Sequence, residues 1–239
     1  MAARKNIFSY LQEDLLECIF KSLNDDHYTF KSLTLVSKHF LSITNRFRFF
    51  ATITVETIPN LPRLFHRFPN LTSLNLSILS ISVEQVDQLL ALISTFPLHI
   101  RSLNLSNGFY SVPANGLIAL SKTMKNLRSL SFYRLVNYRK KVLFLIADCF
   151  PLLEELNFSY PRVSCSADFD VDVNDPLLAL PNLRNINLSC NFITDQFINF
   201  LRHSCKHLQV IRIIYKISKH LGDVGKKYGK YDSSDIIYL

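Results

Sequence analysis

Glycine and tryptophan are the residues that this sequence most lacks, with five glycines and no tryptophan among 239 residues. So little glycine argues against collagen-like segments, flexible linkers and glycine-rich phosphate-binding loops. No apolar run approaches the roughly 18 residues that a membrane-spanning helix needs. Near the start, Glu13, Asp14 and Glu17 interrupt any apolar stretch of a signal peptide. We therefore expect a cytoplasmic or nuclear protein, or one found in both places, with no contact to membranes.

The cysteines are odd in number, at five, lie far apart and form no Cys-x-x-Cys pair. This distribution indicates free thiols in a reducing compartment. Two short stretches resemble metal sites only in part. Residues 168–174 open like a calcium loop, but the glycine and the glutamate of that loop are replaced downstream. His203 and His207 flank Cys205, but no second ligand cluster follows. We expect no metal and no other cofactor.

Charge is unevenly balanced, with 27 lysines and arginines against 19 acidic residues and a formal net charge of +8. The basic residues are spread along the chain, and the only dense run is residues 139–141, which we interpret as a solvated loop or the start of a helix. The excess of positive charge leaves an acidic partner or a nucleic acid open as a binding partner.

The chain does contain an internal repeat. Six copies of the pattern apolar-x-x-apolar-x-apolar begin at Leu71, Ile100, Leu127, Leu153, Leu183 and Leu208. Their starts are 29, 27, 26, 30 and 25 residues apart, and a weaker copy begins at Phe50. The copy from Leu183 continues to Asn191 and Ile193, and so fills the whole pattern LxxLxLxxN/CxL. The repeat resembles that of leucine-rich-repeat proteins.

Each repeat predicts one strand and one helix. The last two apolar residues of a copy are two apart, so they face the same side of a short strand. Helical spacing follows at Val83–Ser94, Asn115–Thr123 and Thr194–His203, where apolar residues form one stripe that can cover the strand. One unit cannot bury its apolar face alone, so the units must stack. We predict an α/β fold, an open curve with a parallel sheet on its inner face.

The first 48 residues break this rhythm. Leu11, Leu15, Ile19 and Leu23 recur every four residues and predict one helix. A second helix is expected around residues 30–36, and a third from Phe40 to about residue 47. We therefore divide the chain into a helical module at residues 6–48, repeats at 49–214, and a cap or tail at 215–239.

The helical module resembles an F-box. The family pattern LPxDLLxxIxxxL is matched by Leu11, residues 14–16, Ile19 and Leu23, and LVCKxF is matched by residues 35–40. Gln12 stands where the family usually has proline, and Ser37 where it usually has cysteine. An F-box followed by leucine-rich repeats implies a substrate receptor of an SCF ubiquitin ligase, in which the F-box binds a Skp-type adaptor and, through it, a cullin.

The resemblance implies that five apolar residues contact the adaptor: Leu11, Leu15, Ile19, Val36 and Phe40. The alternative is that the same five residues are simply the core of a three-helix cap.

Strand parity identifies the residues on the inner face of the predicted sheet. Most of them are serine and asparagine, which would keep an exposed sheet solvated. Larger or more distinctive side chains among them are candidates for contact with a protein substrate: Tyr133, Glu155, Asn157, Asn187 and Arg212. Tyrosine and arginine are favoured at binding hot spots.

No catalytic constellation is present, because no Ser-His-Asp or Cys-His pairing follows from the spacing. We expect a non-catalytic substrate-recognition adaptor of an SCF-type ubiquitin ligase. Two alternatives remain: a leucine-rich-repeat protein-binding scaffold without coupling to a ligase, and, less favoured, a nucleic-acid binder.

Overall fold

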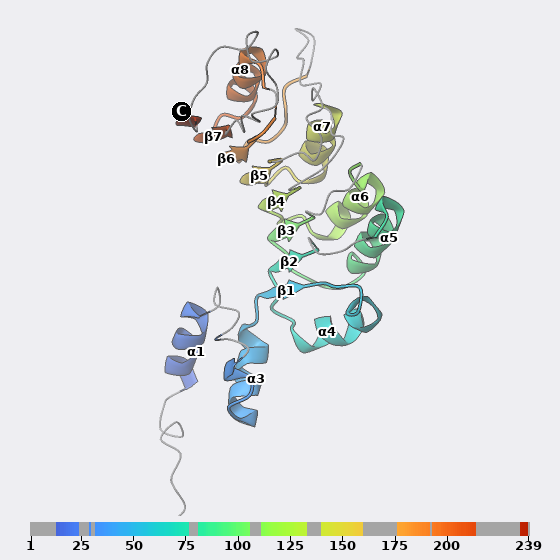
Figure 1. Ribbon diagram of the computed structural model, residues 1–239, viewed down its shortest axis with the longest axis vertical. Helices are drawn as coiled ribbons and strands as arrows, with labels where there is room; N and C mark the ends of the chain where they lie inside the picture. Colours follow the sequence, from blue (N-terminus) through green and yellow to red (C-terminus); the bar gives the residue numbers. More distant parts are fainter. Residues whose placement is uncertain are drawn as a thin grey trace, which may run out of the picture.

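The computed structural model describes residues 13–23, 29, 32–76, 81–105, 111–132, 140–159, 176–191, 193–213 and 235–238. Two helices, α1 (Glu13–Ser22) and α3 (Lys38–Phe47), form one end, and strands then alternate with helices (Figure 1). No helix among the described residues has the length and apolar character needed to cross a bilayer.

Seven short strands pair in parallel, each beside its predecessor in the sequence. They are β1 (Phe50–Thr52), β2 (Ser73–Asn75), β3 (Ser102–Asn104), β4 (Ser129–Ser131), β5 (Glu155–Asn157), β6 (Asn185–Asn187) and β7 (Val210–Ile213). An eighth strand, β8 (Asp235–Tyr238), pairs antiparallel with β7. The sheet is open, and the α/β class predicted from the repeat is confirmed.

Helices lie along one side of this sheet (Figure 1). They are η2 (Ile58–Asn60), α4 (Leu61–Arg67), α5 (Val83–Ile93), α6 (Ala114–Thr123), α7 (Lys140–Cys149) and α8 (Asp195–Ser204). The three helices predicted inside the repeats are present, with ends that differ by one residue. The dense basic run at residues 139–141 contains Lys140, the first residue of α7, so of its two interpretations the start of a helix is the one that the structure shows.

Capping side chains define where two of these helices begin. The Ser82 hydroxyl accepts from the Gln85 amide, and the Gln85 side chain accepts in return from the Ser82 amide, which is a complete capping box for α5. The Thr194 side chain accepts from the Phe197 amide and so caps the start of α8.

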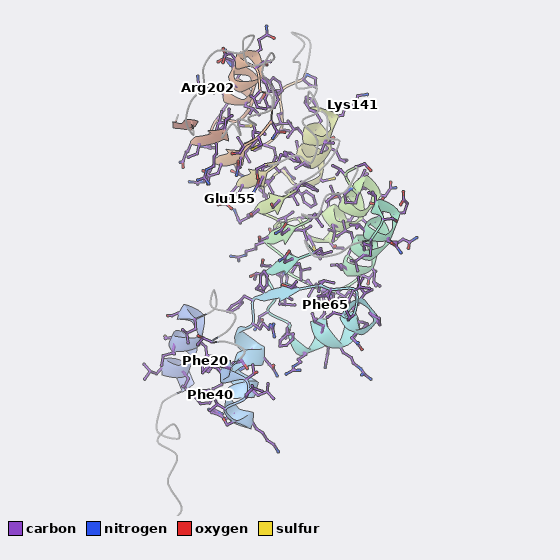
Figure 2. The ribbon with its side chains drawn as sticks, in the orientation of Figure 1. Phe20, Phe40, Phe65, Lys141, Glu155 and Arg202 are labelled. Atoms are coloured by element: carbon purple, nitrogen blue, oxygen red, sulfur yellow. The ribbon has the colours of Figure 1, made fainter. Side chains whose placement is uncertain are left out.

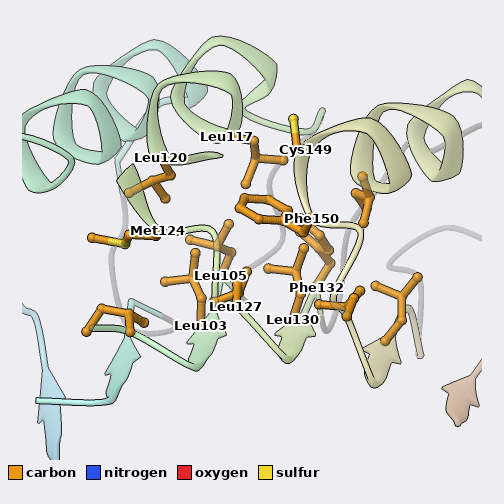
Figure 3. Packing of buried hydrophobic residues seen from close by; sticks show 14 of the residues in the cluster. Leu103, Leu105, Leu117, Leu120, Met124, Leu127, Leu130, Phe132, Cys149 and Phe150 are labelled. Carbon is orange, nitrogen blue, oxygen red and sulfur yellow. The ribbon is translucent and has the colours of Figure 1, made fainter. Parts of the chain in front are cut away.

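The core lies between the sheet and the helices (Figure 3). The middle residue of every strand from β2 to β6 is buried and faces the helices, and β7 buries the equivalent residue: Leu74, Leu103, Leu130, Leu156, Ile186 and Ile211. Phe132 and Phe158, which follow β4 and β5, stack with their ring centroids 5.3 Å apart. The residues on either side of these middle positions are partly buried or exposed in strands β2 to β6, so strand parity predicted the two faces correctly within those strands.

Asn191 joins two neighbouring repeat units. Its side chain is buried, and Nδ2 donates to the carbonyls of Phe158 and Leu188, each at 2.9 Å. Cys190 has a φ of 66°, a left-handed conformation in which a residue other than glycine is uncommon. The turn after β6 is therefore held by side-chain bonds, at the one repeat that fills the whole sequence pattern.

Candidate protein-binding surfaces

The N-terminal module has its own small core between α1 and α3. Leu16 and Phe20 of α1 are buried against Phe40 and Ile43 of α3. The rings of Phe20 and Phe40 meet edge to face, with centroids 5.5 Å apart (Figure 2). Of the expected second helix, around residues 30–36, the structure describes residues 32–36, where Leu33 packs against this core. The Val36 amide donates to the Leu33 carbonyl at 3.2 Å.

Two of the apolar residues proposed for adaptor contact lie on the outer face of α1. Leu15 and Ile19 are four residues apart, so they lie one turn apart on the same face of the helix. Their exposed fractions are 50% and 43%, whereas Leu16 and Phe20 beside them are buried. Helix α1 thus presents apolar residues on two faces, and the stripe predicted from Leu15 and Ile19 is the face that stays in solvent.

The segment before α3 adds two more exposed apolar side chains. Val36, a predicted contact, is 56% exposed, and Leu35 beside it is 82% exposed. Ser37 follows and accepts a hydrogen bond from the Phe40 amide at 3.2 Å, which caps α3. The serine that replaces the usual cysteine of the pattern therefore starts the helix, and a threonine or aspartate could do the same.

Phe40 is corrected from a contact residue to a core residue. Its exposed fraction is 6%, because α3 turns this side chain toward Phe20. Leu35 was not among the predicted contacts, although it is the first residue of the matched LVSKHF segment. Leu11 lies outside the described residues. With Leu35 added, the exposed apolar residues of the described part of this module are Leu15, Ile19, Leu35 and Val36.

The end of α3 is tied to the first repeat unit. Arg67 donates from Nε to the side-chain oxygen of Asn45 at 3.2 Å, and Asn70 donates from Nδ2 to the carbonyl of Arg46 at 2.8 Å. The guanidinium carbon of Arg48 lies 5.0 Å from the centre of the Phe68 ring. These contacts connect α3 with α4 and the turn that follows it. The helical module is therefore held against the first repeat unit by side-chain contacts as well as by the covalent chain.

The inner-face candidates divide into two rows on the sheet. Asn157, Asn187 and Arg212 are directly paired across β5, β6 and β7, so the fold brings these three together. Glu155 is two residues before Asn157 on the same strand and is exposed on the side away from the helices (Figure 2). Tyr133 lies outside the described residues.

The two asparagines of this row bond to their own strand ends. Asn157 accepts from the Ser159 amide through Oδ1 at 2.9 Å, and Asn187 accepts from the amide and hydroxyl of Ser189. Strand parity also predicts Ser159 and Ser189 on the inner face, but both are buried, so the prediction is wrong for these two serines. The strand ends at residue 157 or 187 and the chain turns there, so alternation no longer holds. Glu155 and Arg212 are the exposed side chains that remain to meet a substrate.

The segment from His203 to His207, which resembles a zinc site only in part, has no thiolate ready to bind a metal. Burial raises the pKa of the Cys205 thiol to about 12, so this group stays protonated at neutral pH. His203 bonds through Nδ1 to the Asn199 carbonyl at 2.7 Å. No cluster of three potential metal ligands occurs within the described ranges. Residues 168–174, the stretch that resembles a calcium loop, fall outside those ranges.

No protein-family model matches this sequence, and no curated protein is significantly similar to it.

Proposed function

We propose that this chain is the substrate-recognition subunit of an SCF-type ubiquitin ligase, with residues 6–48 acting as an F-box and the repeats as a leucine-rich-repeat substrate receptor. In this role it is not an enzyme: it binds a Skp-type adaptor that leads to a cullin, and it holds a protein substrate for ubiquitination. Such a ligase works in the cytoplasm, the nucleus or both.

The observation that carries the proposal is the exposed apolar group at the positions where the sequence resembles an F-box. Among the described residues, eight large apolar side chains are exposed, and four of them lie between residues 15 and 36. Single exposed leucines are ordinary, but a small helical module that exposes four has apolar surface to bury against a partner. The buried set from Leu16 to Ile43 supplies the module's own core, so the exposed set is not needed for it.

The test is binding to a purified Skp-type adaptor. A Leu15→Asp/Val36→Asp variant places two charges on the proposed contact surface while leaving the Leu16, Phe20, Phe40 and Ile43 core intact. We expect its affinity to fall about tenfold or more, because desolvating an unpaired carboxylate opposes binding. Isothermal titration calorimetry gives the affinity, and circular dichroism checks that both proteins are folded.

The matched control carries the same substitutions on the repeats. Leu92 on α5 and Ile118 on α6 are 43% and 42% exposed. Leu92→Asp/Ile118→Asp therefore adds the same charge as the contact variant and removes a similar exposed apolar area. The control should bind the adaptor as the unaltered chain does. Equal binding by both variants would remove the proposed contact. An unaltered chain that binds no adaptor would favour the scaffold without coupling to a ligase.

A further inference from the structure

The turns that lead into strands β3 to β7 gather basic residues that are far apart in the sequence. The four residues before each of these strands are 98–101, 125–128, 151–154, 181–184 and 206–209. Together they hold five lysines and arginines, two histidines and one acidic residue: Arg101, Lys125, Arg128, Arg184, Lys206, His99, His207 and Glu154. All but Glu154 are exposed. We name this set the strand-start edge.

Backbone hydrogen bonds hold the residues just before the strands in line. The Arg128 amide donates to the Arg101 carbonyl at 2.8 Å, and the Glu154 amide to the Arg128 carbonyl at 2.7 Å. The Arg184 amide continues the series to the Glu154 carbonyl at 2.8 Å. Adjacent strands lie ~4.8 Å apart, so Arg101 and Arg184 are about 14 Å apart along this row. The backbone atoms from which these side chains extend therefore keep a fixed spacing.

A hollow of about 360 Å³ opens on this edge. It is lined by Arg128, Leu152, Glu154, Asn182, Arg184 and His207. Arg128 and Glu154 form an ion pair beside it. Because the charges of that pair largely neutralise each other, the remaining positive charge of the lining comes from Arg184, which lies in the lining with His207. The lining therefore favours a carboxylate.

We propose that the strand-start edge binds an extended, mostly acidic segment of a protein partner. Carboxylates of the segment would pair with Arg101 on one side of Glu154 and with Arg184 and Lys206 on the other. A basic residue of the segment would face the exposed Glu155, while Glu154 keeps its ion pair with Arg128. Under the proposed function, this segment belongs to the substrate, so the inference adds an acidic feature to what the repeats select.

The composition of the edge favours a peptide over a nucleic acid. The Arg128–Glu154 ion pair leaves little net charge at the centre of the row, and the exposed Glu155 follows it, so a uniform line of phosphates would meet a like charge there. The five turns contain no phenylalanine, tyrosine or tryptophan on which bases could stack. A peptide can change the sign of its charge from one residue to the next, and at ~3.3 Å per residue about five extended residues span the row from Arg101 to Arg184.

The experiment uses the whole purified chain and needs no adaptor, so its failure leaves the adaptor test untouched. The probe is a fluorescent synthetic peptide with aspartates and glutamates on both sides of one central lysine. Fluorescence anisotropy should show binding that weakens as salt rises from about 0.05 M to 0.5 M, because salt screens exposed charges. Arg101→Glu/Arg184→Glu should weaken binding at least tenfold at the lower salt.

The control reverses two charges on the helices. Lys141 on α7 and Arg202 on α8 are exposed and lie on helices, outside the five turns of the strand-start edge (Figure 2). Lys141→Glu/Arg202→Glu changes the net charge as the edge variant does, so it should leave peptide affinity within about twofold. The edge variant should instead gain affinity for a peptide in which lysines replace the acids, and this gain cannot come from unfolding.

Three results would overturn the proposal. One is no peptide binding by the unaltered chain at the lower salt. The second is equal loss in the edge and helix variants, which would trace binding to net charge alone. The third is tighter binding of a single-stranded RNA with the same number of negative charges, which would assign the edge to nucleic acid.

Discussion

Asparagine has two different tasks in this protein, although its side chain is the same at each position. On β5 and β6, Asn157 and Asn187 accept from the amides that follow their strands, and both side chains remain at the surface of the sheet. Asn191 is buried and donates to carbonyls of two repeat units. The residue type therefore does not decide the role. The place in the repeat pattern does, because of these three asparagines only Asn191 stands three residues after the last apolar position of its copy, Leu188.

Substitution of Asn191 should measurably weaken the fold. Asn191→Ala removes the side-chain donor to the carbonyls of Phe158 and Leu188, so we expect the free energy of unfolding to fall by about 2 kcal/mol. Asn191→Asp should cost more, since a buried carboxylate cannot donate and carries charge. Urea unfolding followed by circular dichroism measures both. Asn126→Ala, at an exposed turn, should stay within about 0.5 kcal/mol; an equal effect at the two sites would contradict the assigned role.

At the scale of elements, the strands and three of the helices could be predicted because their apolar residues recur with one spacing. Helix α4, which lies between the weak first repeat and β2, was not predicted. Strand β8 was not predicted either, since its pairing partner β7 is more than 20 residues away in the chain. The inner face was predicted as far as the strands extend. Beyond residues 157 and 187, parity failed because each strand is only three residues long.

The candidate site was predictable in part for a similar reason. A spacing of four residues placed Leu15 and Ile19 on one face of a helix, but that spacing does not tell whether the face meets solvent or another helix. Phe40 was assigned to the surface, and only the arrangement of α1 against α3 shows that it is core. Part of the strand-start edge is visible in the sequence, because the residue after the first apolar position is arginine in three of the six repeats, at Arg101, Arg128 and Arg184.

Helices α5 and α6 approach each other closely at Gly116. A Cβ built there would lie 2.8 Å from Leu90 Cβ and 3.0 Å from Asp87 Cα, and the Gly116 amide donates to the Asp87 carboxylate at 2.7 Å. Alanine favours a helix over glycine by about 1 kcal/mol, but the clash involves backbone and Cβ atoms that have no rotamer to change.

We therefore expect Gly116→Ala to lower the free energy of unfolding by about 1–2 kcal/mol, because the cost of overpacking exceeds the gain in helix propensity. Urea unfolding gives the value. The adjacent, exposed Asn115→Ala should change stability by no more than about 0.5 kcal/mol. A stabilised Gly116→Ala protein would mean that α5 and α6 can move apart at little cost.

The whole molecule is a line of units in which each strand pairs with its sequence neighbours alone. In such an array, stability is approximately a sum of units and their interfaces, and the two ends need protection. At one end, α3 is bonded to the first unit through Asn45 and Arg46. At the other end, β8 pairs along β7 and occupies the edge that a terminal parallel strand would otherwise leave open. Strand β8 thus covers this edge of the sheet.

Removal of β8 should have a local effect. In a variant that lacks residues 235–239, the backbone of β7 loses its outer partner, so amides of residues 210–213 should exchange with solvent faster, while those of β2 and β3 should not change. Ile236→Pro, which places a proline in the middle of β8, should act in the same direction but less strongly. Hydrogen–deuterium exchange with mass spectrometry resolves the segments, and light scattering detects self-association through the open edge. Equal acceleration in β2 and in β7 would show that the array unfolds as one cooperative unit, and unchanged exchange in β7 would show that β8 contributes no protection.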